Sequence, residues 1–162
     1  MGLDLSISCN KTFIKKTTGV FIRENGMNKE LKTIEEVKKY FPNSDISHIK
    51  EYEYESNNVF DKHITHNLWK MASKVVSKEN NTLYYLLWRP EEIGFTIINE
   101  SYIKNIKECL DYLIEKRKEL EKYNPPNGFG SYESLYEFVK ELYDCIIALN
   151  LKNDVYEIYA SR

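Results

Sequence analysis

Apolar and polar residues alternate near both ends of the chain. Leu3–Ile7 has the two-residue period of a strand with one buried face, and Val155–Tyr159 predicts a short strand of the same kind. Between them, Leu83–Trp88 is a near-continuous apolar run, which is typical of a central strand buried on both faces. We therefore expect these three segments to share one sheet, with Leu83–Trp88 in its interior and Arg89-Pro90 ending it.

Four other segments have apolar residues three and four apart, the spacing of an amphipathic helix. Thr33 and Glu36 form a capping box at the start of the first. Either Asn99 or Ser101 can cap the third, and Ser131 can cap the last. The expected helices run from Thr33 to about Phe41, from Ile64 to Val76, from Ile103 to Leu120 and from Ser131 to Leu149.

Weaker patterns predict strands at Phe13–Ile22 and His48–Glu55, with a turn at Asn25-Gly26. The expected order of elements is β(β)αβαβααβ, without an internal repeat. A mixed or mainly antiparallel sheet with about four helices on one side satisfies this order. The predicted fold class is therefore α+β, as a single two-layer domain over residues 1–162.

Composition narrows the classes of function. The net charge is −2, which is not the basic footprint of a general nucleic-acid-binding protein, although a pocket for a small anionic ligand needs little positive charge. The 13 tyrosines suit sheet faces, interfaces and ligand pockets equally well. Nucleic-acid binding in general is therefore not expected, whereas a small anionic ligand and a homo-oligomer are left open.

Cysteine spacing and hydropathy indicate the compartment. Cys9, Cys109 and Cys145 are far apart and form no CxxC or CxxH motif, which favours reduced thiols in a cytosolic protein. No stretch approaches the roughly 20 apolar residues that span a bilayer, and the N-terminal residues lack the pattern of a signal peptide. We expect a cytoplasmic protein that does not associate with membranes.

The first candidate site is His63–Asn67, at the start of an expected helix. Free amides and the positive end of the helix dipole accept anionic groups, so His63, His66 and Asn67 are candidate ligand-binding residues. The HxxH spacing has no third ligand nearby and is a weak metal motif, so no metal is expected. The alternative is the ordinary structural role of polar residues at helix starts.

The second candidate site, Trp88, Arg89 and Glu92, directly follows the expected central strand. Ligand sites often lie just beyond strand ends. Trp offers a stacking face, and Arg offers a planar fork for phosphate or carboxylate. The alternative is an edge Trp followed by a turn and solvated charges.

The third candidate site is a glycine loop that includes Gly128 and Phe129 and leads into Tyr132. Its backbone amides can approach a phosphate, but it has neither the Lys of a P-loop nor the GxGxxG spacing. A plain helix–helix turn is the alternative. Together with Arg162, this loop is expected to close a cleft that the other two candidate sites form.

Several sequence blocks are similar to those of a group of small phage and prophage proteins: MGLD, THNL–MA, WRPEE–G, NG–G–Y and a terminal Ser161-Arg162. The chain resembles that group over most of its length, except at Cys9–Glu55, and Phe129 stands where the group's pattern has Trp. The resemblance implies a phage origin and a location in the host cytosol, without supplying an activity. Phage proteins of this size often inhibit host defences, and some sequester nucleotide-derived immune signals.

The leading expectation is a protein that binds a small, nucleotide-derived anion without catalysis. The sequence has no GxSxG, no kinase motifs and no Cys beside a candidate His, so neither a catalytic residue nor a cofactor is expected. Two alternatives stay open. One is a hydrolase or transferase that uses His63 or His66 with Glu91 or Glu92. The other is an inhibitor that binds a host protein through a tyrosine-rich surface.

Overall fold

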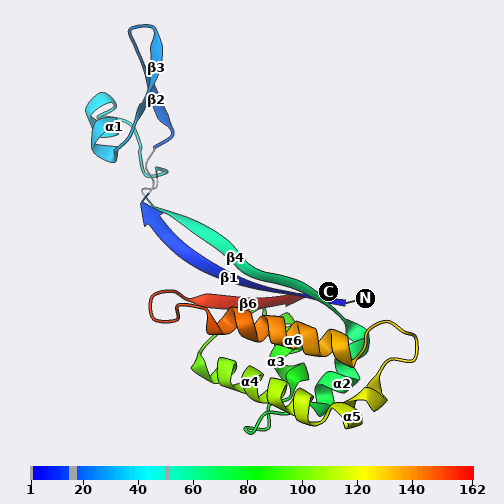
Figure 1. The fold of residues 1–162 in the computed structure, drawn as a ribbon. Helices are drawn as coiled ribbons and strands as arrows, with labels where there is room; N and C mark the ends of the chain where they lie inside the picture. The colour runs from blue at the N-terminus through cyan, green and yellow to red at the C-terminus, as the bar shows by residue number, and fades with distance from the viewer. Residues whose placement is uncertain (1, 15–17, 50–51) are drawn as a thin grey trace. The chain divides into compact units, whose positions relative to one another are not determined.

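The computed structural model describes residues 2–14, 18–49 and 52–162, and Figure 1 shows their helices and strands. The strands are β1 (Gly2–Ile14), β2 (Val20–Glu24), β3 (Met27–Leu31), β4 (Tyr52–Thr65), β5 (Thr96–Ile97) and β6 (Tyr156–Ser161). The α-helices are α1 (Ile34–Tyr40), α2 (Trp69–Lys74), α3 (Leu83–Ile93), α4 (Glu100–Glu115), α5 (Arg117–Leu120) and α6 (Tyr132–Ile147). Two short 3-10 helices are η1 (His66–Leu68) and η2 (Glu121–Tyr123). The predicted α+β fold class is confirmed.

Contacts along the chain define two compact units. Unit 1 consists of Met1–Cys9 and Asn57–Arg162, and unit 2 consists of Asn10–Ser56. The chain therefore leaves unit 1 early and returns to it after completing unit 2. That residues 1–162 behave as a single domain stays a prediction.

The sheet of unit 1 has the strand order β4-β1-β6-β5. Strand β6 pairs antiparallel with β1 on one side, where Leu5 faces Ala160, and with β5 on the other. Leu3, Leu5 and Ile7 of β1 are fully buried, whereas Asp4 between them is exposed, which confirms the predicted alternation. In Figure 1 the helices of unit 1 lie on one side of this sheet, as a two-layer α+β arrangement requires.

The core of unit 1 lies between the sheet and these helices. Helices α4 and α6 bury the apolar stripe that their spacing predicted, and each begins at a predicted cap. The Asn99 side chain accepts from the Tyr102 amide at 2.8 Å, and the Ser131 hydroxyl accepts from the Ser134 amide at 3.3 Å. The fully buried large side chains include Leu68, Met71, Leu83, Leu87, Ile106, Leu113 and Leu135.

The segment Leu83–Trp88 is not a strand but the first half of helix α3, so that prediction was wrong. Thr82 begins the helix, because its hydroxyl accepts a hydrogen bond from the amide of Tyr85 at 3.1 Å. Four of the six residues are buried, and the exposed one, Tyr85, is aromatic. The segment therefore shows no polar face from which its helical period can be read.

Pro90 lies inside α3 instead of ending it, against the sequence expectation. A proline within a helix has no N–H for the carbonyl four residues earlier, here that of Leu86. The buried hydroxyl of Tyr102 on α4 donates to that carbonyl at 3.2 Å. A side chain from the neighbouring helix thus satisfies the acceptor that Pro90 leaves free.

The predicted helix Ile64–Val76 begins later and is shorter than expected. Strand β4 continues to Thr65, so Ile64 is buried as an inward residue of a strand. After η1, helix α2 covers only Trp69–Lys74, and Val75 takes an extended conformation. Val76 then forms an isolated antiparallel bridge with Thr82. The apolar residues between Ile64 and Val76 belong to a strand, two short helices and a bridge, and their spacing matched that of one helix by chance.

Unit 2 contains the hairpin β2–β3, which turns at Asn25-Gly26 as predicted, and helix α1. The Thr33 hydroxyl accepts from the Glu36 amide at 3.2 Å, but the Glu36 carboxylate accepts from the amide of Lys32. The predicted strand Phe13–Ile22 falls partly on residues 15–17, and His48–Glu55 falls partly on residues 50–51, all outside the described residues. Strand β4 begins within the second of these predictions, at Tyr52.

Candidate functional site

A pocket of about 540 Å³ lies in unit 1, where strand β4 ends and the glycine loop passes beside it. Three of the predicted ligand-binding residues, His63, Asn67 and Phe129, line it although they come from separate segments of the sequence. The other lining residues are Gly2, Thr65 and Gly130. We call this space the Phe129 pocket.

His63 lies on β4, not at a helix start as predicted from the sequence. Its Nδ1 atom is 2.8 Å from the Oδ1 atom of Asp4 on β1. Both side chains are about three-fifths exposed, so the pair adds little to stability, but it orients the imidazole ring. A Cβ atom at Gly2 would lie 1.9 Å from Cε1 and 2.2 Å from Nε2 of His63. Glycine at position 2 therefore leaves the space that this edge of the ring occupies.

Thr65 is the last residue of β4, and Asn67 lies within η1, which follows directly. The Thr65 hydroxyl accepts a hydrogen bond from the amide of Asn67 at 3.4 Å and so begins η1. The Nδ2 atom of Asn67 donates to the Phe129 carbonyl at 3.4 Å. The Asn67 side chain therefore connects the end of β4 to the glycine loop.

The glycine loop joins η2 to α6, so it is a helix–helix connection as well as a pocket wall. Gly130 has a φ of +93°, and a Cβ atom there would lie 2.6 Å from Cγ2 of Thr65. Phe129 is 68% exposed, and its amide donates to the Asn127 side chain at 3.1 Å. Close packing at Gly130 thus fixes the loop, while the neighbouring Phe129 ring stays accessible.

His66 and Trp88 contact each other, and neither is among the residues that line the Phe129 pocket. Their ring centroids are 6.4 Å apart, and Trp88 stacks on Tyr84 with centroids 5.1 Å apart. Trp88 is only 2% exposed, so it is a core residue of α3 and not the open stacking face that a loop position would give. Within the described residues, its Nε1 atom has no hydrogen-bond partner.

The charged candidates lie on α3 and at the end of β6. Arg89 and Glu92 are one turn apart, and their side chains form an ion pair of 2.9 Å. Arg162 pairs with Glu91 at 2.7 Å. None of these four is among the residues that line the Phe129 pocket. Of the residues expected to share one cleft, His63, Asn67 and Phe129 line the Phe129 pocket, whereas His66, Trp88, Arg89, Glu92 and Arg162 do not.

The two remaining candidates lie within the glycine loop and at its end. Gly128, within the loop, has a φ of +75°, and a Cβ atom there would meet nothing within 4 Å. Tyr132 is buried at the start of α6, where its hydroxyl donates to the carbonyl of Leu113 and its ring stacks on Tyr136. Burial raises the pKa of the Tyr132 hydroxyl. Tyr132 holds the base of the loop and is not on the wall of the pocket.

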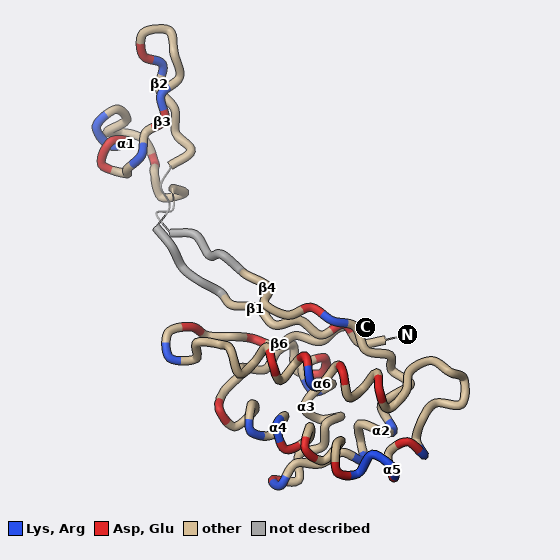
Figure 2. Tube along the Cα trace, viewed as in Figure 1, with Lys and Arg blue, Asp and Glu red and all other residues tan. Residues whose placement is uncertain are grey.

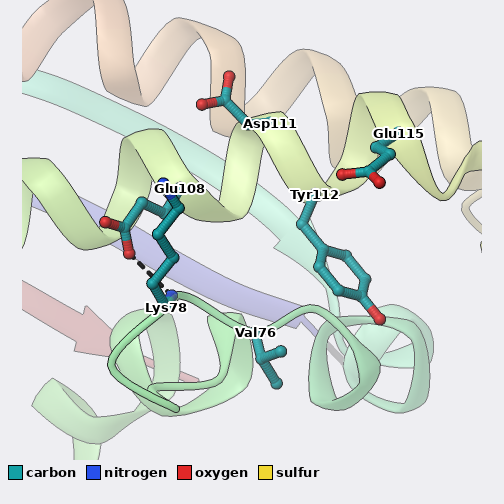
Figure 3. Close-up of a pocket in the computed structure, with 6 residues that line it drawn as sticks. All are labelled: Val76, Lys78, Glu108, Asp111, Tyr112 and Glu115. Atoms are coloured by element: carbon teal, nitrogen blue, oxygen red, sulfur yellow. Dashed lines mark hydrogen bonds between the residues drawn. The ribbon is translucent and has the colours of Figure 1, made fainter.

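Unit 1 contains other hollows. One of about 150 Å³, drawn in Figure 3, lies beside α4 and presents Glu108, Asp111 and Glu115, which suits an anion poorly. Another, of about 610 Å³, has Lys74 and Lys122 in its wall together with Tyr112, Glu119, Leu120 and Tyr123; we call it the lysine pocket. Figure 2 shows acidic and basic residues interspersed along α4 and α5.

The described residues contain no group of three or more His, Cys, Asp or Glu side chains that could hold a metal ion. Nor does any helix in the described part of the chain have the length and apolar character to cross a bilayer. Neither a protein-family model, nor a curated protein, nor a solved structure matches the chain. Sequence reasoning missed Asp4 and Gly2 as parts of the site, because their roles depend on contacts between distant segments. Thr65 and Gly130 lie within candidate segments but were not singled out.

Proposed function

We propose that this chain is a binding protein that holds a small nucleotide-derived molecule in the Phe129 pocket and does not turn it over. The observation that carries the proposal is the meeting of His63, Asn67 and Phe129 around one pocket. Its volume of about 540 Å³ lies within the roughly 300–1,000 Å³ of small-molecule sites. An exposed aromatic ring beside hydrogen-bonding side chains is the usual composition of such a site.

The resemblance to phage proteins suggests the purpose of such binding. A phage protein that retains a nucleotide-derived immune signal would keep it from the host's defence proteins. Retention requires tight contacts but no nucleophile and no general base. Stacking on Phe129 and hydrogen bonds to Asn67 and His63 supply contacts of that kind.

The enzymatic alternative paired His63 or His66 with Glu91 or Glu92. In the structure Glu91 pairs with Arg162 and Glu92 with Arg89, whereas the carboxylate beside His63 is that of Asp4. A general base in this pocket would therefore be an Asp4–His63 dyad. For this reason the test of binding has to include a search for product.

The test is native mass spectrometry of the full chain purified from phage-infected cells. We expect a small molecule to remain bound to the wild type and to be recovered unchanged after incubation. Phe129→Ala should lose about 1–3 kcal/mol of binding free energy, the value of one base–aromatic stack. Phe21→Ala, at a similarly exposed phenylalanine in unit 2, is the matched control and should retain the ligand.

Other outcomes would replace the proposal. A processed product would favour the enzymatic alternative, and a captured host protein would favour an inhibitor that acts through a tyrosine-rich surface. Equal retention by wild type and Phe129→Ala would place the ligand elsewhere.

A further inference from the structure

The walls of the Phe129 pocket carry little positive charge. Of the described residues that line it, none is Lys or Arg, and His63 is the sole titratable side chain. Phosphate recognition in proteins usually relies on Arg or Lys. The two arginines that the sequence suggested, Arg89 and Arg162, are paired with Glu92 and Glu91 outside this wall.

The hydrogen-bonding groups of the pocket include two acceptors. The Nδ2 atom of Asn67 donates to the Phe129 carbonyl, and this contact assigns the other side-chain atom, Oδ1, as an acceptor that is free to meet a ligand. The carboxylate of Asp4 accepts from Nδ1 of His63, so a neutral imidazole carries its proton on Nδ1 and leaves a lone pair on Nε2.

Gly2 leaves room for the Nε2 edge of His63, because a Cβ atom at that position would lie 2.2 Å from Nε2. The His63 side chain lines the pocket and is about three-fifths exposed. The Phe129 ring, 68% exposed, supplies an aromatic face on the other wall. The pocket therefore offers a stacking surface and two acceptors, which complement a flat group that donates hydrogen bonds.

We propose that the Phe129 pocket recognises the base of its ligand, an amino-bearing heteroaromatic ring that stacks on Phe129 and donates hydrogen bonds to Asn67 Oδ1 and His63 Nε2. This inference rests on the proposed binding function. It adds which part of the ligand the pocket recognises. Phosphate groups of the ligand point to solvent and contribute little to binding at this site. Asp4 acts as a positioning residue, because it fixes the tautomer of His63.

The test compares matched nucleosides with the full-length protein by isothermal titration calorimetry. The pairs are adenosine with purine riboside and guanosine with inosine, which differ only in one exocyclic amine. In at least one pair, we expect the amine to improve affinity by about 5-fold to 150-fold, the range for satisfying a buried acceptor. The affinity for the 5′-monophosphate of that nucleoside should change less than 2-fold between low and high salt, roughly 50 and 500 mM, because its phosphate points to solvent and is not neutralised.

Variants connect the affinity to the pocket. Phe129→Ala should weaken nucleoside binding by about 5-fold to 150-fold, whereas Lys74→Ala, in the lysine pocket, should leave it unchanged. Asp4→Ala should shift the imidazole ¹⁵N resonances of His63 toward the tautomer with the proton on Nε2 and should weaken binding. Asp111→Ala, which removes an exposed carboxylate on α4 paired with Lys107, is its control and should do neither.

Several results would overturn the inference. These are equal affinity within both nucleoside pairs, no nucleoside binding at millimolar concentration, or competition by ribose 5-phosphate that depends steeply on salt. Each of them leaves the proposed function standing if the protein from infected cells still retains a small molecule. If that protein retains none, the proposed function itself fails.

Discussion

Gly130 and Gly128 provide a matched pair of substitutions that measures how tightly the glycine loop packs onto the end of β4. Both glycines have a positive φ, +93° and +75°, so alanine at either position incurs a backbone cost of about 1–2 kcal/mol. At Gly128 a Cβ atom would meet nothing within 4 Å. At Gly130 it would lie 2.6 Å from Thr65 Cγ2 and 3.1 Å from Leu68 Cγ. Relieving such overpacking costs about 1–3 kcal/mol more.

We therefore expect Gly130→Ala to lower the free energy of unfolding by about 2–5 kcal/mol and Gly128→Ala by about 1–2 kcal/mol. The restriction of the unfolded chain by alanine is the same in both variants and cancels in their difference. That difference, about 1–3 kcal/mol, reports the contact with Thr65 and Leu68 alone.

Urea unfolding followed by tryptophan fluorescence measures both values, provided that the dependence of stability on urea stays constant between variants. Equal losses for the two variants would refute the reasoning, because the contact at Gly130 would then cost nothing. A Gly130→Ala protein as stable as the wild type would show that the loop does not pack against β4 as described.

Further predictions concern the core helices and their titration. Tyr102→Phe should lower the free energy of unfolding by about 1–3 kcal/mol, because the Leu86 carbonyl that Pro90 leaves free loses its buried donor. In a Pro90→Ala background, urea unfolding should show a smaller loss for Tyr102→Phe. Equal losses in the two backgrounds would contradict this role of the Tyr102 hydroxyl. Asn99→Ala should cost about 1 kcal/mol in the same assay, whereas Ser101→Ala, at the alternative cap that α4 does not use, should cost less than about 0.5 kcal/mol. Burial raises the pKa of the Cys109 thiol from 9.0 to about 12, so the unfolded thiol ionises first and stability present below pH 9 should be lost as the pH rises toward 12. Cys109→Ala should flatten that part of the stability–pH curve, and an unchanged curve would contradict this cause.

Local signals predicted the ends of elements better than they predicted the type of buried ones. Asn99 and Ser131 cap their helices as expected because a cap depends on neighbours within a single turn. The segment Leu83–Trp88 was assigned wrongly, since a run of buried apolar residues has the same appearance in a strand and in a helix. Pro90 added to this error, because a proline was expected to end the element and not to lie inside a helix. The hydroxyl that makes it tolerable comes from Tyr102, on another helix.

The candidate site was predicted in part for a related reason. His63, Asn67 and Phe129 stand out in the sequence as polar or aromatic residues beside turns and apolar runs. The grouping of Arg89 and Glu92 with them depended on a loop after a strand, and both instead lie on a helix where they pair with each other. The contact of Asp4 with His63 depends on how β1 and β4 lie beside one another, which no local pattern specifies.

The position of β6 has a consequence for the order in which this protein can be made. Although β6 follows all other described elements in the chain, it lies between β1 and β5 and pairs Leu5 with Ala160. During synthesis, β1 leaves the ribosome long before its partner exists. β1, with its fully buried Leu3, Leu5 and Ile7, can then pair with β4 but lacks its other neighbour, β6, while the helices of unit 1 emerge. The sheet of unit 1 can close only after β6 has been translated, so a ribosome stalled before Tyr156 should hold a chain that is open to proteases and chaperones.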